Sequence, residues 1–204
     1  KLSHTKVELT YNLMRTFVAG LAFAMPFSLV YQMMSDRMKG QQKSEKVIKG
    51  LPFAAGFTAG TAVSIAGNMH YVIYAQIIPL IEKLTGKEVS SYWFPDATRY
   101  IGYNPYREED RTIHEFPCYS FVLGDLHAHV VNIMFVLLVI AFLYVWLRGV
   151  RKKTVPVETS MKDGKFWKEQ LLMPHLLVIS ALLGMFQWTN FWDFVIYYVV
   201  TLGT

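Results

Sequence analysis

Residues 130–147 read VVNIMFVLLVIAFLYVWL, a run of 18 residues without a formal charge. A helix that crosses a bilayer needs roughly 20 predominantly apolar residues. Comparable blocks occupy residues 16–34, 51–81 and 171–204, and only 17% of the chain is charged, against about 25% in soluble domains. Four such blocks leave too little of the 204 residues to cover them in a soluble core. The sequence therefore predicts an all-α, multi-pass transmembrane helix bundle of about four spans, with an irregular extracytoplasmic loop region.

The loops between these blocks differ in charge. Residues 35–50 carry five basic and two acidic residues, residues 148–170 carry seven basic ones, and residues 82–117 carry five basic and seven acidic ones. Lys- and Arg-rich loops of membrane proteins face the cytoplasm. We therefore expect cytoplasmic loops at 35–50 and 148–170, an outer loop at 82–129, and a location in the plasma membrane. Contact with the lipid bilayer explains the placement of the basic residues, so the net charge of +5 does not indicate a nucleic acid partner.

Single cysteines test this topology. Lys43→Cys and Lys162→Cys, each in a Cys118→Ser background, should react with a membrane-impermeant thiol reagent only from the cytoplasmic side. Glu108→Cys should react only from the outside, because the basic residues of short loops set the orientation. Labelling of all three positions from one side would contradict the topology.

We interpret residues 1–204 as a single membrane-embedded domain and as a fragment of a longer chain, because the sequence starts at Lys1 rather than Met and stops within an apolar run. The one cysteine, Cys118, excludes an internal disulfide. In the second block, small residues recur at a spacing that lets membrane helices pack closely: Ala55, Gly56, Ala59 and Gly60. Residues 51 to about 67 of this block suffice to cross most of the membrane core, so that Asn68, His70 and Gln76 lie near the outer surface. Pro79 is expected to mark a break, and the chain beyond Asp193 to form a returning or interfacial helix.

Chemistry-bearing residues gather where the third span begins, in the run GDLHAH at 124–129. A carboxylate beside two imidazoles can act as a general base, bind a phosphate or hold a metal ion. In an extended chain His127 and His129 point the same way and can share a metal, whereas in a helix they diverge and Asp125 pairs with His129. The structural alternative is that Asp125 caps the third helix and that the histidines are interfacial polar groups.

The outer loop holds a further candidate, Glu115. Its spacing from Thr112 is that of a capping box, which is the structural reading. Pro117 forces Phe116 toward an extended shape, however, and this disfavours a regular helix at Glu115. A role in a functional site therefore stays open for Glu115.

Other polar and aromatic residues of the outer loop have simpler readings. Asp96 and Arg99 are expected to form a surface ion pair, with binding of a polar substrate as the alternative. The aromatic residues read as an interfacial belt, with stacking on a sugar as the alternative: Tyr92, Trp93, Phe94, Tyr100, Tyr103 and Tyr106.

Asp193 and Asn190 interrupt the fourth apolar block on the side of the membrane where Asp125 lies. An isolated carboxylate in apolar surroundings is costly to keep charged. Carboxylates and their hydrogen-bonding partners should therefore share a site. We expect one cavity to collect Asp125, His127, Asn190 and Asp193, with His70 or Glu115 nearby.

The sequence resembles the YYY-type uncharacterised membrane proteins of bacteria and archaea in three runs: TIHEFP at 112–117, SFVLGDLHAH at 120–129 and TNFWDF at 189–194. It departs from them at Ala128 and Val195, where the family commonly has proline. That family looks similar to GT-C-type integral membrane glycosyltransferases. These take a sugar from a polyprenyl-phosphate carrier on the outer side, using a carboxylate in the first outer loop. The tyrosine run that names the family, and the acidic loop before it, are not in this sequence.

The resemblance implies the middle part of a polyprenyl-phosphate-sugar-dependent glycosyltransferase acting at the extracytoplasmic face. The candidate catalytic residues are Asp125, Glu115 and Asp193. The candidate substrate-binding residues are His127, His129, His70, Asn190, Arg99 and Arg111. The cofactor is unknown, and a divalent metal ion on Asp125, His127 and His129 stays open. Two alternative functions also stay open: an ion- or proton-coupled transporter with an Asp/His relay, and a membrane metal-dependent hydrolase.

Overall fold

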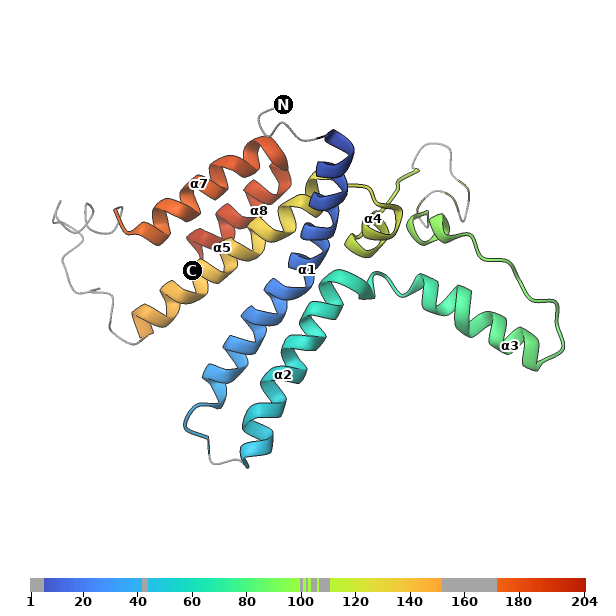
Figure 1. The fold of residues 1–204 in the computed structure, drawn as a ribbon, viewed down its shortest axis with the longest axis horizontal. Coiled ribbons are helices and arrows are strands. Elements are labelled where there is room, and N and C mark those ends of the chain that lie inside the picture. Colours follow the sequence, from blue (N-terminus) through green and yellow to red (C-terminus); the bar gives the residue numbers. More distant parts are fainter. Residues whose placement is uncertain are drawn as a thin grey trace. The chain divides into compact units, whose positions relative to one another are not determined.

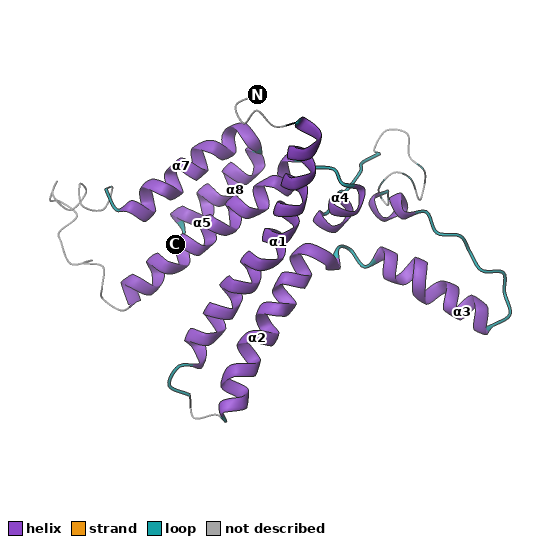
Figure 2. Cartoon of the chain, in the orientation of Figure 1, coloured by secondary structure: helices purple, strands orange, loops and turns teal. Residues whose placement is uncertain are grey.

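The computed structural model describes residues 6–41, 44–99, 101, 103, 106, 111–151 and 172–204, and these residues are largely helical (Figure 2). Lys43, Glu108 and Lys162 lie outside the described residues, as does most of the predicted cytoplasmic loop 148–170. In the described part of the chain, β pairing is limited to two isolated bridges, Ile101 with Thr112 and Tyr103 with Tyr106. The all-α prediction is confirmed.

The chain forms two compact units, Lys1–Leu126 and His127–Thr204. The first unit contains α1 (Val7–Met38), α2 (Glu45–Thr61), the π-helical segments η1 (Ala62–Ala66) and η2 (Val72–Ile77), α3 (Ile78–Leu84), the 3-10 turn η3 (Phe94–Thr98) and α4 (Pro117–Leu123). The second unit contains α5 (Ala128–Arg151), α7 (Pro174–Thr189) and α8 (Phe191–Leu202) (Figure 1).

Two helices are long and apolar enough to cross a membrane, judged by length and composition. They are α1, with 32 residues, and the segment Ala128–Val150 of α5, with 23 residues. The helices α7 and α8 are shorter and apolar, and α2 runs directly into η1. These helices fit a membrane-embedded bundle, whose number of spans stays a prediction.

The helices α1 and α2 pack together along a face of small residues. Pro52, Gly56 and Gly60 are the buried residues of α2, and they recur every four residues along one side of the helix. A Cβ atom on Gly56 would lie 2.8 Å from the carbonyl oxygen of Phe27, and one on Gly60 would lie 2.9 Å from that of Phe23. Only glycine permits so close an approach of the two backbones, which confirms the predicted packing at Gly56 and Gly60.

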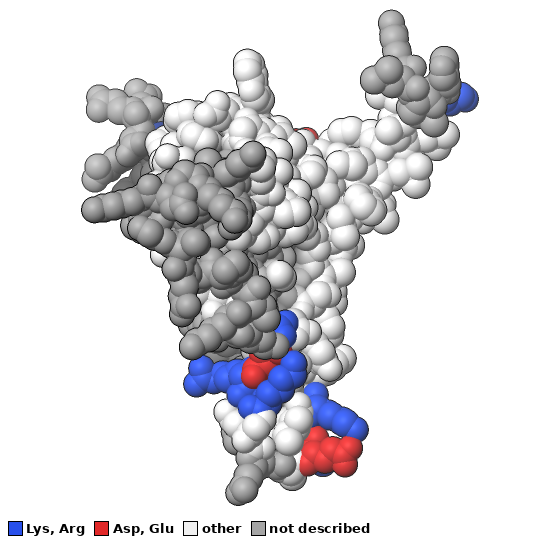
Figure 3. Space-filling view, turned by 90° about the vertical axis from the view of Figure 1, so that its left-hand side faces the viewer, with Lys and Arg blue, Asp and Glu red and all other residues white. Residues whose placement is uncertain are grey.

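The other faces of this helix pair are apolar and open. Phe17, Phe53 and Phe57 are each more than half exposed, as expected for side chains that contact lipid rather than water. Charged residues cluster instead near the connection of the two helices, at Asp36, Arg37, Lys39, Glu45, Lys46 and Lys49. Figure 3 shows charged side chains gathered at one end of the face in view, below a wide uncharged surface.

The helix of the second apolar block ends at about the residue where its span was predicted to end. The helical run of α2 and η1 ends at Gly67, whose φ is +54°. A Cβ atom there would collide with the ring of Phe116. Pro79 lies in the first turn of α3, directly after η2, so the predicted break at Pro79 is wrong. Proline is tolerated in a first helical turn, because no intrahelical bond is lost there.

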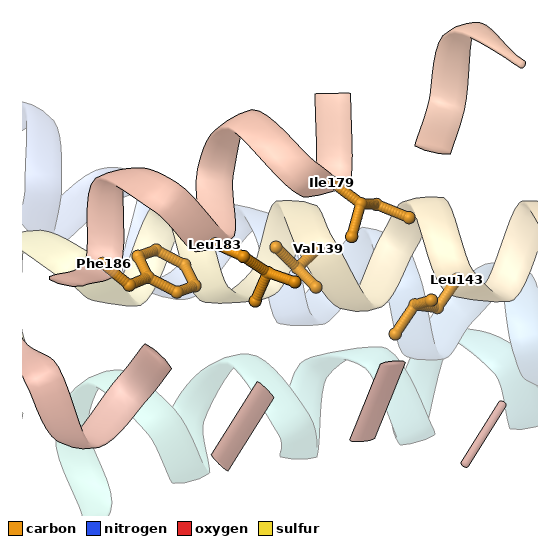
Figure 4. Close-up of a cluster of buried hydrophobic side chains, with 5 residues drawn as sticks. All are labelled: Val139, Leu143, Ile179, Leu183 and Phe186. Carbon is orange, nitrogen blue, oxygen red and sulfur yellow. The ribbon is translucent and has the colours of Figure 1, made fainter. Parts of the chain in front are cut away.

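The core of the second unit joins α5 to α7. It consists of five buried side chains, shown in Figure 4: Val139, Leu143, Ile179, Leu183 and Phe186. The ring of Phe186 also meets that of Tyr197 on α8, with centroids 6.2 Å apart. Only Asn190 separates α7 from α8, so α8 folds back onto α7. This confirms the expected returning helix beyond Asp193.

Candidate functional site

The carboxylate of Asp193 is held by two amides. The Nδ2 of Asn132 donates to Asp193 Oδ2 at 2.9 Å, and the Nδ2 of Asn190 donates to the same oxygen at 3.0 Å. Asn132 is 1% exposed, and its buried Oδ1 has no hydrogen-bond partner among the residues that the structure describes. The sequence had singled out Asp193 and Asn190, and the structure joins them.

The local fold explains this arrangement. Asn190 has an extended backbone (φ −155°, ψ 100°), which ends α7 and starts α8. Its carbonyl oxygen accepts hydrogen bonds from the backbone N–H groups of Asp193 and Phe194, at 3.0 and 3.3 Å. Asp193 therefore lies in the first turn of α8, where the helix dipole stabilises a negative charge.

The two histidines lie at the start of α5, on either side of its first residue. The rings of His127 and His129 stack, with centroids 5.7 Å apart and an interplanar angle of 22°. The backbone carbonyl of His127 accepts the first helical hydrogen bonds, from Val130 and Val131. Of the two alternatives, the chain is outside a helix up to His127, and α5 begins with Ala128. The two rings lie next to each other, as expected for the extended alternative.

His129 and Asn132 are three residues apart on α5, so they lie on neighbouring positions of one helix face. Asn132 in turn reaches Asp193 on α8. The second unit thus brings together the start of α5 and the start of α8. Asn132, Asn190 and Asp193 are joined by hydrogen bonds at this end, and His127 and His129 lie at the start of the same helix as Asn132.

Asp125 belongs to the first unit and follows a sharp turn at the end of α4. Gly124 has φ +77°, and the backbone N–H groups of Gly124 and Asp125 both donate to the carbonyl of Ser120, at 2.8 and 2.9 Å. A turn therefore directly precedes Asp125. The position that caps α5 is that of His127, two residues later. Convergence of Asp125 with Asp193 stays a prediction.

Two residues of α1 hold this turn in place. Tyr11 Oη donates to the carbonyl of Gly124 at 3.2 Å and accepts from the backbone N–H of Leu126 at 3.0 Å. The guanidinium of Arg15 packs so closely on Gly124 that any Cβ atom there would collide with it. Two side chains of α1 therefore contact the backbone on either side of Asp125 in the sequence, at Gly124 and Leu126.

His70 lies in an aromatic cluster of the first unit. Its Nδ1 is 3.1 Å from Tyr92 Oη, and its ring stacks on Tyr74 with centroids 4.3 Å apart. Tyr71 packs edge-on against both Tyr92 and Phe94. Burial raises the pKa of Tyr92 above its ordinary value, and the nearby negative charge of Asp96 raises this pKa further. Tyr92 thus keeps its proton at neutral pH and stays a hydrogen-bond donor.

The basic candidates lie over aromatic rings. The Cζ of Arg99 is 4.4 Å from the centroid of Trp93, and that of Arg111 is 4.1 Å from the centroid of Tyr106. Among the described residues, ion pairs join Lys39 to Asp36 and Lys49 to Glu45. The expected pair of Asp96 and Arg99 is not among them, because a cation–π contact takes its place.

Glu115 lies in an extended segment before α4, not in a helix. Phe116 is extended (φ −131°, ψ 157°) and α4 starts at Pro117, as Pro117 predicted. No helix begins at Thr112, so the capping-box reading of Glu115 is wrong. The segment is tied to η3 by the backbone N–H of His114, which donates to Thr98 O at 2.9 Å.

Three residues of these clusters escaped the sequence reasoning: Tyr11, Arg15 and Asn132. Asn132 is the one amide in residues 130–147, three positions after His129, and that spacing is a signal in hindsight. Tyr11 and Arg15 share a helix face only because α1 starts at Val7, earlier than the apolar block. Among the described residues, no three His, Cys, Asp or Glu side chains are grouped to hold a metal ion.

A double-mutant cycle measures the bond between Asn132 and Asp193. Asn132→Leu should lower the free energy of unfolding by about 1.5–3 kcal/mol, because a hydrogen bond to a charged group is lost. In an Asp193→Leu background the same change should have little effect, since no carboxylate is left without its partner. Unfolding in denaturant of the detergent-solubilised protein gives the four free energies. Additivity within about 0.5 kcal/mol would show that the two side chains do not interact.

Comparison with known proteins gives one match. The family model described as "Uncharacterized membrane protein (DUF2298)" covers residues 1–204. No curated protein and no solved structure matches the chain. The match supports the membrane character that the apolar helices indicate, and it specifies no reaction.

Proposed function

Since the chain belongs to the DUF2298 family of uncharacterised membrane proteins, we propose that it forms part of a multi-pass glycosyltransferase of the plasma membrane. The donor is a sugar linked to a polyprenyl phosphate, and transfer takes place at the extracytoplasmic face. The resemblance to GT-C-type enzymes suggests this reaction. The observation that carries the proposal is the carboxylate of Asp193 in its amide cradle.

The proposed step is a direct displacement. The oxygen of an acceptor hydroxyl bonds to the anomeric carbon of the sugar, and the bond from that carbon to the phosphate oxygen breaks. The polyprenyl phosphate leaves with the electron pair, and the hydroxyl proton passes to a carboxylate acting as general base. Donors near the leaving phosphate stabilise the charge that develops there.

Asp193 suits the role of base. Both amides bind Oδ2, and no described residue donates a hydrogen bond to Oδ1. Oδ1 can therefore accept the hydrogen bond of an acceptor hydroxyl, while Asn132 and Asn190 orient the carboxylate through Oδ2.

The remaining candidates have supporting roles in the proposal. Asp125 is the alternative base, on a turn that Tyr11 and Arg15 hold rigid. His127 and His129 lie one turn before Asn132 and would contact the donor sugar or its phosphate. Contacts with the substrate are assigned to His70, Arg99 and Arg111, and Glu115 stays a further candidate for a catalytic carboxylate.

A turnover assay tests the proposal. The full chain, reconstituted in vesicles, is given fluorescent polyprenyl-phosphate sugars with different sugar groups, together with membrane lipids and peptides as acceptors. We expect release of polyprenyl phosphate and transfer of the label to an acceptor. Absence of release for every donor would overturn the proposal. Proton-coupled uptake of a solute into the same vesicles would instead support the transporter alternative, which the part-buried pair of Asn132 and Asp193 also suits.

A further inference from the structure

An open groove of about 430 Å³ lies between α1, η1 and α4. This size is within the range of small-molecule sites. Its lining is almost entirely apolar: Ala19, Phe23, Ser64, Ile65, Cys118, Phe121 and Val122. The π-helical turn η1 contributes Ser64 and Ile65, and such turns inside helices are frequent at functional sites.

The polar side chains of the groove do not require a hydrogen bond from a ligand. The hydroxyl of Ser64 already donates to the carbonyl of Gly60 at 2.7 Å. The pKa of the Cys118 thiol is raised by burial, so the thiol is neutral at physiological pH. Side chains such as Phe23, Phe121 and Val122 offer dispersion contacts alone. A hydrocarbon chain therefore suits the groove better than a polar molecule does.

A cation lies at one end of this groove. Arg15 is one helical turn before Ala19, which lines the groove from α1. Its guanidinium packs on Gly124, directly after α4, whose Phe121 and Val122 form the opposite wall. No ion pair of the described residues includes Arg15, although it lies within an apolar helix. Because Arg15 directly precedes the uncharged block 16–34, the predicted topology places it at the outer end of this block, where a long cationic side chain can reach an anionic head group or water.

We propose that the groove binds the chain of a polyprenyl monophosphate and that Arg15 binds its phosphate. This inference rests on the proposed function, because it names where the lipid carrier of the sugar lies. Apolar walls below one guanidinium match a molecule with one long hydrocarbon chain and one anionic head. A guanidinium binds phosphate oxygens in bidentate fashion. The bound phosphate would then lie beside the turn that carries Asp125.

The native cysteine reports on occupancy of the groove. Cys118 is the only cysteine of the chain and lines the groove, so the rate of its reaction with a small thiol reagent measures access to this space. The full chain is placed in nanodiscs of uncharged lipid and labelled at mildly alkaline pH, because the raised pKa slows the thiol at neutral pH. Polyprenyl monophosphate at ten times its Kd should slow labelling about tenfold.

Three comparisons decide the outcome. The corresponding polyprenol, which lacks the phosphate, should need about 10- to 100-fold higher concentration for the same protection, the value of one charged hydrogen-bonded contact. Arg15→Gln should remove this difference between the two lipids. Arg37→Gln, at the far end of the same helix, should leave it unchanged. Val122→Trp should fill the groove and slow labelling without any lipid, which separates occupancy from misfolding.

Equal protection by the phosphate and the alcohol would overturn the proposal, and so would an Arg15→Gln variant that binds like the native protein. Equally strong protection by an anionic phospholipid and by polyprenyl phosphate would indicate a general lipid site. This outcome would also overturn the proposal. Protection of Cys118 without turnover would support the lipid site in the groove and contradict the proposed glycosyltransferase activity. Turnover with an unchanged KM for the donor in the Arg15→Gln variant would support the glycosyltransferase activity and contradict the proposed lipid site in the groove.

Discussion

Asp193→Asn is expected to lower the turnover of polyprenyl-phosphate sugar by about 100-fold or more, which is the usual contribution of a general base. The substitution keeps the size of the side chain and removes its ability to take a proton. It also keeps a side-chain oxygen for Asn132 and Asn190, so the hydrogen-bonded cluster should survive. The initial rate of polyprenyl phosphate release at saturating donor measures the loss.

The control is Asp36→Asn. It removes a carboxylate near the C-terminal end of α1, where Asp36 pairs with Lys39. This variant should turn over the donor at the native rate, because an exposed ion pair contributes little. Asp125→Asn in the same assay separates the two candidate bases, since only the base should reduce the rate this strongly. A fully active Asp193→Asn enzyme would show that Asp193 is structural.

The second large effect concerns packing. Gly60→Leu should lower the free energy of unfolding by about 3 kcal/mol, at the upper end of the range for overpacked cores. A Cβ atom at position 60 would already lie 2.9 Å from the carbonyl of Phe23 and 3.0 Å from its ring. The backbone of α1 cannot move aside without losing its other contacts with α2. Thermal unfolding of the purified protein in detergent measures the change.

Gly20→Leu is the matched control. Gly20 lies in α1, and a Cβ atom there would meet nothing within 4 Å. Replacing this glycine should leave stability unchanged or raise it by up to about 1 kcal/mol, because leucine favours the helix. Equal effects of the two substitutions would mean that α1 and α2 do not pack along Gly60 in the membrane.

The helical, membrane-embedded character could be predicted from the sequence because it depends on local composition. Apolar runs such as residues 130–147 have few alternatives to a helix in lipid, where every backbone group must be paired within the segment. The small-residue face at Gly56 and Gly60 could be recognised for a similar reason, since its periodicity is that of one helix. The end of the second helix at about Gly67 could be predicted from the length of a span, whereas its contact with Phe116, which is distant in sequence, could not.

The candidate site, like the fold, could be predicted from the sequence only in part. The sequence by itself determined the residue types, and so it singled out Asp125, Asp193 and Asn190 as polar groups among apolar ones. Only the tertiary structure decided their partners. Asn132 meets Asp193 because α8 folds back after Asn190, and Tyr11 reaches the turn at Gly124 across 113 residues of chain. A hydrogen bond between distant segments depends on packing, and packing is a property of the whole unit rather than of a local pattern.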